Sequence, residues 1–322
     1  MDDQKKIDLK TIMVDTFINS VERGINLVVI VGDSTSTSKI KPFSEKYPDR
    51  LVNVGIAEQC LVGVAAGLSL GGFVSVTANA AAFLTARSNE QVKNDICYSN
   101  TNVKLVGLNA GVSYGPLAST HHAIDDISIM RGLGNILIFA PSDPLETKQI
   151  FEYSFDYEGP VYIRMGTEKF PILHDINYKF EPGKIDILKS GKDISIYAMG
   201  SVVCEAFEAG VELKNLQIDA EVVNISSIRP LNKQSIIDSI KKTKKVITVE
   251  EHTIHGGIGS IIAEIIAEEG LNVKLVRLGI TEGEFAKAGP INMIREYYKI
   301  DSKGIIETAK SLVKSSLNVI HN

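Results

Sequence analysis

The chain has 322 residues and 44% hydrophobic content, so it can bury substantial cores, and its length predicts two domains at roughly 100–200 residues each. Its formal net charge is −5 and its Lys and Arg residues are scattered, which excludes a basic stripe for a nucleic-acid backbone or an anionic membrane. The charged N-terminus lacks the apolar core of a secretory signal, and no apolar run approaches the roughly 20 residues that cross a bilayer. We therefore expect a cytoplasmic protein that acts on small molecules.

The first half of the chain alternates helix-like and strand-like runs. Apolar residues recur at helical spacing over residues 9–21 and stop at Gly24, and the apolar run 25–32 is typical of a buried strand. The pattern continues with predicted helices over 56–70, 84–98, 124–131 and 144–155, and predicted strands over 73–78, 102–111, 135–142 and 160–166. Strands separated by helices indicate a mainly parallel sheet that is covered on both faces.

The second half repeats this organisation after a break. The periodicity stops in a stretch that contains Pro171, Pro182 and Gly183, which predicts an interdomain linker over 171–191. Four further strand-like runs then alternate with helical ones, at 193–201, 219–226, 245–251 and 272–280. The predicted fold class is α/β, with two domains over 1–170 and 192–322, each a mainly parallel sheet flanked by helices.

The three cysteines are far apart in the sequence. Cys60, Cys97 and Cys204 have no Cys-x-x-Cys or Cys/His metal spacing. We expect buried free thiols rather than a disulfide or a zinc site. No metal site is predicted within this chain.

The segment with the most chemical information runs from residue 50 to residue 72. It places Glu58 in the first turn of a long apolar helix, directly after a strand and Gly55. An acidic residue at this position often does no more than complement the helix dipole, and the glycine can simply turn the chain. The segment alone therefore does not establish a function.

Several segments in register carry a resemblance to a known family. Residues 55–59 (GIAEQ), 83–112, 120–146 and 159–166 occur in the order and approximate spacing of the pyrimidine-binding domain of transketolases and 1-deoxyxylulose 5-phosphate synthases. Residues 246–264 (VITVEEHTIHGGIGSIIAE) resemble the transketolase C-terminal domain. The resemblance covers nearly the whole chain. It implies a thiamine-diphosphate-dependent transferase that moves a two-carbon ketol unit from a ketose or ketose phosphate to an aldose.

The resemblance assigns cofactor contacts to four residues. It implies that the Glu58 carboxylate hydrogen-bonds a ring nitrogen of the cofactor's aminopyrimidine and stabilises its imino tautomer. Phe83 matches an aromatic residue that stacks on this ring, and Arg87 resembles an arginine of some bacterial relatives. Asp33, with the hydroxyl-rich loop 34–38, falls where family members line the entrance to the cofactor and substrate. Phe83 as a core residue and Arg87 as a solvated charge remain alternatives.

The resemblance also assigns substrate contacts. His121 aligns with a histidine that faces the substrate, and a near-neutral pKa suits proton exchange with sugar hydroxyls. His122 completes a histidine pair similar to that of the deoxyxylulose phosphate synthases. Arg164, at the end of a strand, matches an arginine that binds a substrate phosphate. Asn109 stands where many transketolases have a histidine that contacts the sugar.

Three positions depart from the family pattern. Ala80 replaces an aromatic residue, Asn109 replaces the histidine, and Leu117 replaces an acidic residue that reads a sugar hydroxyl. A site that lacks a hydrogen-bond partner discriminates poorly for that hydroxyl, and an apolar wall disfavours it. The sequence therefore predicts a modified, less hydroxylated or nonphosphorylated sugar as substrate.

The resemblance also shows which family element is missing. Family members hold the diphosphate through a divalent metal on a Gly-Asp-Gly motif that is followed by an asparagine, and the fragment Gly32-Asp33-Ser34 has no such sequel. We expect an N-terminal partner subunit to supply this site and its Mg²⁺ or Ca²⁺. Two copies of each chain would form a heterotetramer.

Three alternatives stay open at this stage. The β subunit of a 2-oxo acid dehydrogenase first component has the same two-domain layout and also donates a glutamate. A 1-deoxyxylulose 5-phosphate synthase-like enzyme is a second alternative. A nonenzymatic interaction module with a decayed site is the third, and the joint presence of Glu58, His121 and Arg164 argues against it.

Overall fold

The computed structural model describes residues 6–317 of the protein. The first half contains, in chain order, β1 (Ile7–Asp8), α1 (Leu9–Glu22), β2 (Leu27–Val31), α2 (Lys41–Lys46), η1 (Pro48–Arg50), β3 (Leu51–Asn53), α3 (Glu58–Leu70), β4 (Val74–Ala80), η2 (Phe83–Arg87), α4 (Asn89–Gln91), η3 (Val92–Tyr98), β5 (Val103–Leu108), η4 (Gly115–Thr120), α5 (Asp126–Arg131), β6 (Leu137–Phe139), α6 (Pro144–Asp156), β7 (Val161–Arg164) and β8 (Lys169–Phe170).

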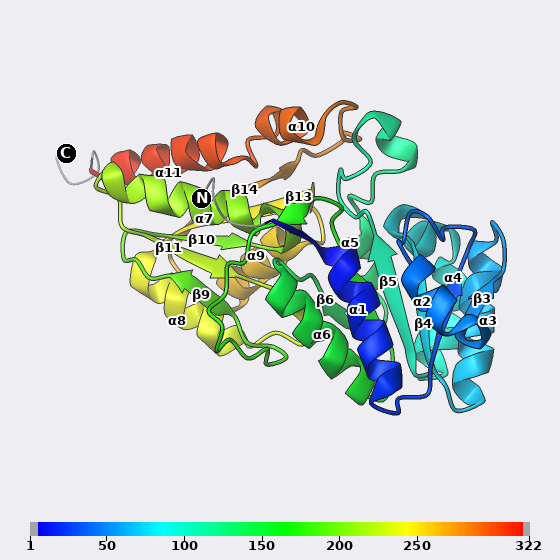
Figure 1. The fold of residues 1–322 in the computed structure, drawn as a ribbon. Coiled ribbons are helices and arrows are strands. Elements are labelled where there is room, and N and C mark those ends of the chain that lie inside the picture. The colour runs from blue at the N-terminus through cyan, green and yellow to red at the C-terminus, as the bar shows by residue number, and fades with distance from the viewer. Residues whose placement is uncertain (1–5, 318–322) are drawn as a thin grey trace.

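The first domain is built on a seven-stranded sheet of order β12-β6-β7-β5-β4-β2-β3. All neighbouring pairs are parallel except β12–β6. Helices α1, α2 and α6 cover one face through a cluster that includes Phe17, Phe43 and Phe151, and α3 and α5 cover the other (Figure 1). The strands β2 and β5 are buried on both faces, which explains why their sequences are nearly continuously apolar.

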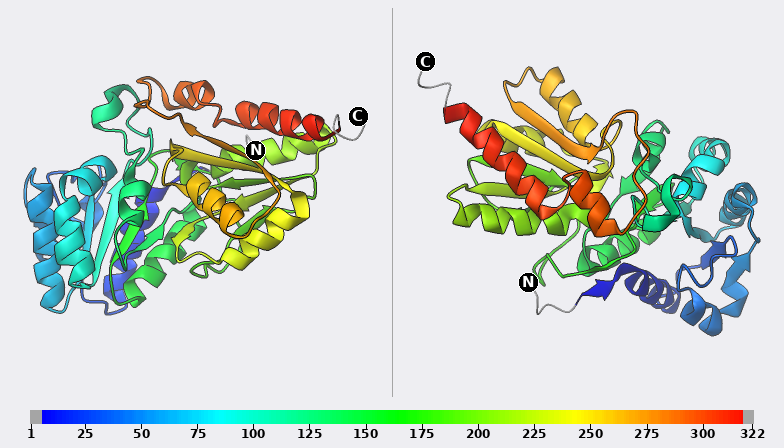
Figure 2. Two further views of the ribbon diagram at one scale, coloured as in Figure 1. Left: turned by 180° about the vertical axis from the view of Figure 1, so that it is seen from behind. Right: turned by 90° about the horizontal axis from the view of Figure 1, so that it is seen from above.

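The second half contains β9 (Asp186–Lys189), β10 (Ile194–Ala198), η5 (Gly200–Val202), α7 (Val203–Asn215), β11 (Ala220–Asn224), β12 (Ser227–Arg229), α8 (Lys233–Thr243), β13 (Lys245–Thr253), α9 (Ile258–Glu268), β14 (Lys274–Ile280), α10 (Ile291–Tyr297) and α11 (Ser302–Leu317). Its sheet has the order β14-β13-β10-β11-β9, and only β9 is antiparallel to its neighbour. Helices α7 and α11 pack on one face and α8 and α9 on the other (Figure 2). The predicted α/β fold class with mainly parallel sheets is confirmed.

The two domains share structure. One apolar cluster runs from α3 of the first domain to α9 of the second, and β12 joins the edge of the first domain's sheet although it follows β11 in the chain. Residues 171–185 lie along α6, where the Gln149 side chain bonds the carbonyl of Tyr178 and the amide of Phe180. The stretch 171–191, expected as a linker, thus contains an edge strand, β9, of the second sheet.

Two local expectations need correction. The helix expected over 84–98 is interrupted, because wide π-helical turns at Phe83–Arg87 and Val92–Tyr98 flank a short α-helical stretch. Cys97 is buried, but Cys60 is exposed because it lies on the side of α3 that faces away from the sheet; Cys204 is half-buried, and all three thiols are free.

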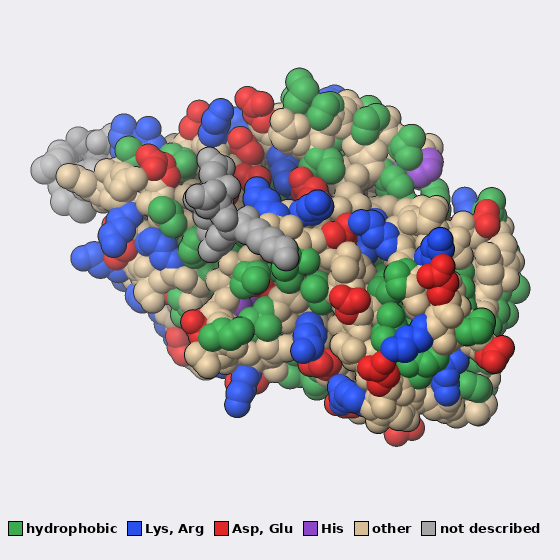
Figure 3. All heavy atoms as spheres, in the orientation of Figure 1, with side chains coloured by type: hydrophobic (Ala, Val, Ile, Leu, Met, Phe, Trp, Pro, Cys, Tyr) green, Lys and Arg blue, Asp and Glu red, His purple; other side chains and the backbone are tan. Residues whose placement is uncertain are grey.

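The surface agrees with the charge pattern of the sequence. Acidic and basic side chains are interspersed over the face drawn in Figure 3, without a stripe of one sign. Within residues 6–317, no helix has the length and apolar character needed to cross a membrane.

Candidate functional site

The turn between β3 and α3 positions Glu58. Gly55 adopts a φ of +74°, which side chains other than glycine rarely tolerate, and the Ala57 amide donates to the Gly55 carbonyl at 2.8 Å. Glu58 is then the first residue of α3, and no side chain caps this helix. The open amides of the first turn and the helix dipole favour a carboxylate there. The Glu58 side chain is only 4% exposed, and these interactions at the helix start offset the cost of burying its charge.

Arg87 pairs with this carboxylate. The Arg87 Nη1 atom lies 2.7 Å from Glu58 Oε2, and the arginine side chain is 52% exposed. Both Phe83 and Arg87 belong to the π-helical turn η2, and the guanidinium carbon lies 5.0 Å from the centre of the Phe83 ring. Such turns inside helices are rare and occur frequently at functional sites. Within residues 6–317, Arg87 is the only hydrogen-bond partner of the Glu58 carboxylate, which leaves Oε1 free.

A row of rings connects this ion pair to the predicted substrate histidine. The Phe83 and His121 rings meet edge to face at 5.2 Å between centroids, and His121 makes a second contact of 5.2 Å with Tyr114. The His121 Nδ1 atom lies 2.9 Å from the Thr120 hydroxyl. The structure therefore brings Glu58, Arg87, Phe83 and His121 into one chain of contacts, and their roles toward cofactor and substrate remain predictions.

The second domain holds the loop that carries His121. Gly115 has a φ of +49°, and a Cβ at this position would lie 2.8 Å from the Gly289 carbonyl oxygen. Next to His121, the buried His122 lies with Nε2 3.0 Å from the Gly115 carbonyl, and burial lowers its pKa. This contact braces the loop, and the His122 Nδ1 atom has no hydrogen-bond partner in the described chain. A substrate contact from His122 remains a prediction.

Asp33 lies beside the turn that precedes Glu58. The Asn53 side-chain oxygen accepts hydrogen bonds from the Asp33 amide at 3.1 Å and from the Gly55 amide at 2.9 Å. This side chain ties the end of β2 to the end of β3. Asp33 is exposed and has a φ of +60°, so its carboxylate is free to meet a ligand or another chain.

The departures from the family pattern have different environments. Asn109 follows β5, is buried at a φ of +54°, and its Oδ1 atom has no hydrogen-bond partner among residues 6–317. Ala80 is buried at the end of β4. Leu117 is exposed on the same loop as His121. Asn109 therefore offers an unused acceptor, and Leu117 presents an apolar side chain.

Arg164 occupies a different environment from the one that its sequence position suggests. It is only 3% exposed, its Nε bonds both Asp126 oxygens at 2.9 and 3.1 Å, and its Nη2 bonds the Glu251 carbonyl at 2.8 Å. The Tyr162 hydroxyl donates to the same aspartate at 2.7 Å. These bonds use Nε and Nη2 and link the two domains. A phosphate contact through the remaining Nη1 group stays a prediction.

Three contributors to the site were not identified from the sequence. Tyr114 contacts His121, and Asn53 ties two strand ends together. The amide nitrogen of the buried Asn79, at the end of β4, has no hydrogen-bond partner in the part of the chain that the structure describes. Asn79 also lies near Gly32, since a Cβ there would be 3.4 Å from its Nδ2 atom. Its position at the carboxyl end of a parallel strand, where open α/β sheets bind ligands, is the signal that could have identified it.

Comparisons with known proteins identify the family of the chain. Residues 5–171 match the family "Transketolase, pyrimidine binding domain", and residues 183–305 match "Transketolase, C-terminal domain". The chain is 56% identical over 304 residues to one subunit of the apulose-4-phosphate transketolase of Actinobacillus succinogenes, covering 94% of this chain and 98% of the relative.

Two further comparisons extend this result. The chain is 31% identical over 306 residues to a 6-deoxy-6-sulfo-D-fructose transketolase subunit of Clostridium sp. (strain MSTE9), with 95% and 94% of the two chains covered. A solved structure titled "Split gene transketolase, inactive beta4 tetramer" superposes with a TM-score of 0.85 at 32% identity, over 96% of this chain and 99% of that one. The protein is therefore a transketolase-type enzyme subunit and belongs to the transketolase family, of which it carries the pyrimidine-binding and C-terminal domains.

Proposed function

We propose that this chain acts with an N-terminal partner subunit to transfer a two-carbon ketol unit from a modified ketose phosphate of the apulose 4-phosphate type to an aldose acceptor. The observation that carries the proposal is the 56% identity to a subunit of an apulose-4-phosphate transketolase, over 94% of this chain. The departures at Asn109 and Leu117 support a donor other than an ordinary ketopentose 5-phosphate. The apolar Leu117 disfavours a hydroxyl where an acidic side chain would bind one.

The residues of the site fit thiamine diphosphate, the cofactor that the transketolase family implies. The free Glu58 Oε1 can hold a hydrogen bond to a ring nitrogen of the pyrimidine, since Arg87 engages only Oε2. Phe83 is half-buried and offers a ring to a flat apolar ligand. When bound, the cofactor supplies the electron sink for breaking a carbon–carbon bond next to a carbonyl.

His121 is the group of this chain that we assign to proton exchange with the substrate. Thr120 contacts its Nδ1, and Phe83 and Tyr114 contact its ring from two directions, so the imidazole is oriented. Its Nε2 atom has no hydrogen bond within residues 6–317 and can accept a proton from, or donate one to, a sugar hydroxyl. Asn109, through its unpartnered oxygen, is the neighbouring candidate for a hydroxyl contact.

The partner subunit would hold the diphosphate and its Mg²⁺ or Ca²⁺. The exposed Asp33 lies beside the Glu58 turn, but the surrounding sequence lacks the metal motif of the family. Two large apolar side chains are exposed near α3, the helix that begins with Glu58. Ile56, just before α3, is 77% exposed, and Tyr98, at the end of η3, is 89% exposed. A partner that covers them would also close the pyrimidine site, and two copies of each chain would form a heterotetramer.

The test is a two-carbon transfer assay on the co-purified complex with thiamine diphosphate and Mg²⁺. We expect transfer from apulose 4-phosphate to exceed that from a ketopentose 5-phosphate at least tenfold, and neither subunit alone to be active. A reversed preference would overturn the proposed donor. Decarboxylation of 2-oxo acids, with no transfer from any ketose, would overturn the transferase assignment itself.

A further inference from the structure

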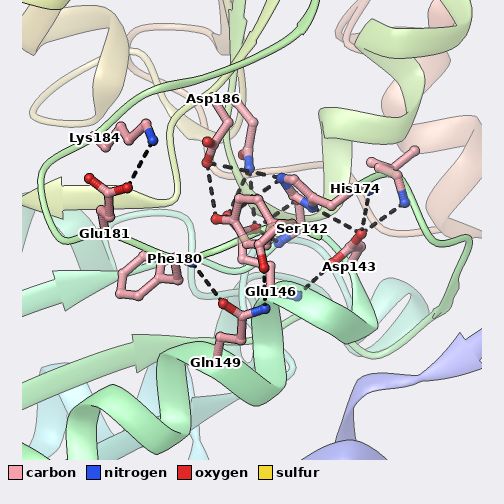
Figure 4. Close-up of polar contacts among 12 residues, drawn as sticks. Ser142, Asp143, Glu146, Gln149, His174, Phe180, Glu181, Lys184 and Asp186 are labelled. Atoms are coloured by element: carbon pink, nitrogen blue, oxygen red, sulfur yellow. Dashed lines mark hydrogen bonds and ion pairs between the residues drawn. The ribbon is translucent and has the colours of Figure 1, made fainter. Parts of the chain in front are cut away.

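A second cluster of ionisable side chains lies where the two domains meet (Figure 4). Asp143 is the N-cap of α6, and Glu146 lies in the first turn of that helix. His174 and Tyr178 come from the segment that runs back along α6, and Asp186 is the first residue of β9. Figure 4 shows the side chains of Asp143, Glu146, His174 and Asp186 pointing toward one another. No sequence motif marks the cluster, because its members come from three separate segments.

The cluster has more negative than positive charge. Asp143, Glu146 and Asp186 face a single imidazole, and none of the three forms an ion pair with a Lys or Arg within residues 6–317. Lys184, two residues before Asp186, pairs with Glu181 instead. Burying carboxylates without a matching cation is costly. A bound cation would remove this imbalance.

The orientation of His174 points to a ligand. Its Nδ1 atom lies 2.9 Å from Asp143 Oδ2, which also accepts the amides of Leu173 and His174 at 2.8 and 2.9 Å. This bond fixes the ring so that Nε2 faces Glu146 and Asp186. The side chain is only 3% exposed, and Nε2 has no hydrogen-bond partner within the described residues. A histidine that donates one ring N–H to a carboxylate while the other nitrogen points inward is the usual arrangement of a metal ligand.

Donor atoms of Glu146, His174 and Asp186 all lie within 4.8 Å of one another, and the Tyr178 ring packs against the His174 ring at 3.9 Å between centroids. His174 Nε2 lies 3.9 Å from Glu146 Oε1 and 4.0 Å from Asp186 Oδ2, distances too long for hydrogen bonds. The Tyr178 hydroxyl lies 3.0 Å from each of the same two oxygens, although its single proton can serve only one of them. Tetrahedral zinc with N and O ligands at about 2.0–2.2 Å separates its ligand atoms by about 3.3–3.6 Å. The observed separations bracket this value.

We propose that Glu146, His174 and Asp186, with the Tyr178 hydroxyl as fourth donor, form a closed structural site for a zinc-type divalent cation. An outer layer holds the ligands in place. Asp143 orients His174, and Glu146 Oε2 accepts from the Ser142 amide at 2.7 Å. The Asn224 side-chain amide donates to Glu146 Oε1 at 3.0 Å and to Oε2 at 3.2 Å. Because Glu146 belongs to the first domain and Asp186 to the second sheet, the ion would clamp the two domains together.

The test uses the full chain, stripped with a chelator and then titrated with Zn²⁺ and, separately, with Co²⁺. We expect one equivalent of Zn²⁺ after gel filtration and intense visible d–d absorption of Co²⁺, the signature of tetrahedral coordination. His174→Ala should weaken Zn²⁺ binding at least about 100-fold, and Asp143→Asn, which alters only the outer layer, about 10–100-fold. The matched control is His255→Ala, since this histidine is exposed and lies outside the cluster.

Two results would overturn the proposal. One is less than 0.1 equivalent of bound Zn²⁺ in the wild-type chain, and the other is a Co²⁺ spectrum that His174→Ala leaves unchanged. If His174→Ala does not fold, Asp186→Asn provides the second variant, because it keeps the side-chain shape. Wild-type Zn²⁺ affinity in a folded Asp186→Asn protein would contradict the assigned ligand set.

Discussion

The Glu58 site and the Arg164 cluster contain the same kinds of residue but differ in how fully these residues are bonded. Arg164 is buried, and its Nε and Nη2 groups bond Asp126 and a carbonyl of the other domain. Among residues 6–317, the Glu58 carboxylate has one hydrogen-bond partner, the exposed Arg87, and one oxygen without a partner. Asn109, which follows β5, also has an unused acceptor. Polar groups that are bonded across the two domains fix how the domains pack, whereas polar atoms without a protein partner within residues 6–317 remain available to a ligand.

The largest expected effect is on catalysis, from Glu58→Gln. The amide keeps the shape of the side chain but cannot take part in proton transfer, so kcat of the assembled complex should fall about 10²–10⁴-fold. Stopped assays of ketol transfer would measure the loss, and gel filtration would verify that the complex forms. Glu45→Gln, at an exposed position on α2, is the matched control. More than a tenth of wild-type activity in Glu58→Gln would remove this residue from the catalytic role.

The second prediction concerns stability, through Arg164→Met. Removing one partner of a buried ion pair leaves the Asp126 charge uncompensated and should cost about 3–5 kcal/mol of the free energy of unfolding. Urea titration would measure the change. Arg23→Met breaks an exposed 3.9 Å contact with Asp156 and should cost less than about 0.5 kcal/mol. If Arg164→Met raised KM for a phosphorylated donor and left stability unchanged, Arg164 would belong to the substrate site after all.

A smaller effect is expected from Phe83→Ala. Loss of one aromatic contact is worth about 0.5–1.5 kcal/mol, which corresponds to a roughly 3–10-fold weaker affinity of the complex for thiamine diphosphate. Calorimetric titration of the complex would measure it. Phe83→Leu keeps the apolar bulk, so its affinity for thiamine diphosphate should lie between those of the wild type and Phe83→Ala. An unchanged dissociation constant in Phe83→Ala would show that this ring belongs only to the protein interior.

The smallest net effect is on the pH dependence of stability, because two buried groups oppose each other. Burial raises the pKa of Glu250 to about 7, although the amides of Gly259 and Ile258 bond its carboxylate. The contribution of Glu250 to the free energy of unfolding is complete below the pKa that this group has in the unfolded chain. It is lost as the pH rises toward 7. Burial lowers the pKa of His252 to about 4, so its contribution is present above the unfolded pKa and is lost as pH falls toward 4.

Single variants should separate the opposing pH dependences of stability that Glu250 and His252 produce. Glu250→Gln should be less stable at pH 5 than at pH 7 by roughly 2 kcal/mol, and His252→Gln should show the reverse. Burial also raises the pKa of Asp186 to about 6, and this contribution is common to all three proteins, so each variant is compared with the wild type at both pH values. Chemical denaturation at the two pH values would measure all three proteins. If the free energy of unfolding changed equally between pH 5 and pH 7 in both variants, Glu250 and His252 would not have the shifted pKa values that their burial produces.

Local sequence patterns determined much of this protein. The alternation of apolar runs at helical and strand spacing predicted two mainly parallel α/β domains, because periodicity reports which face of an element is buried. It also placed Glu58 in the first turn of α3, since Gly55 and the apolar helix are neighbours in the chain. The row from Glu58 to His121 followed from a resemblance that is itself a pattern of sequence segments in order.

Only the tertiary structure decided which partners distant residues meet. The position of Arg164 at a strand end did not show that its Nη2 group bonds the carbonyl of Glu251, 87 residues away. The edge strand β12 was too short to recognise, and its pairing with β6 depends on how the domains pack. Glu146 and His174 likewise converge from separate segments. A sequence specifies backbone preference and burial locally, whereas the bonding of a buried polar group depends on contacts that exist only after the domains have packed.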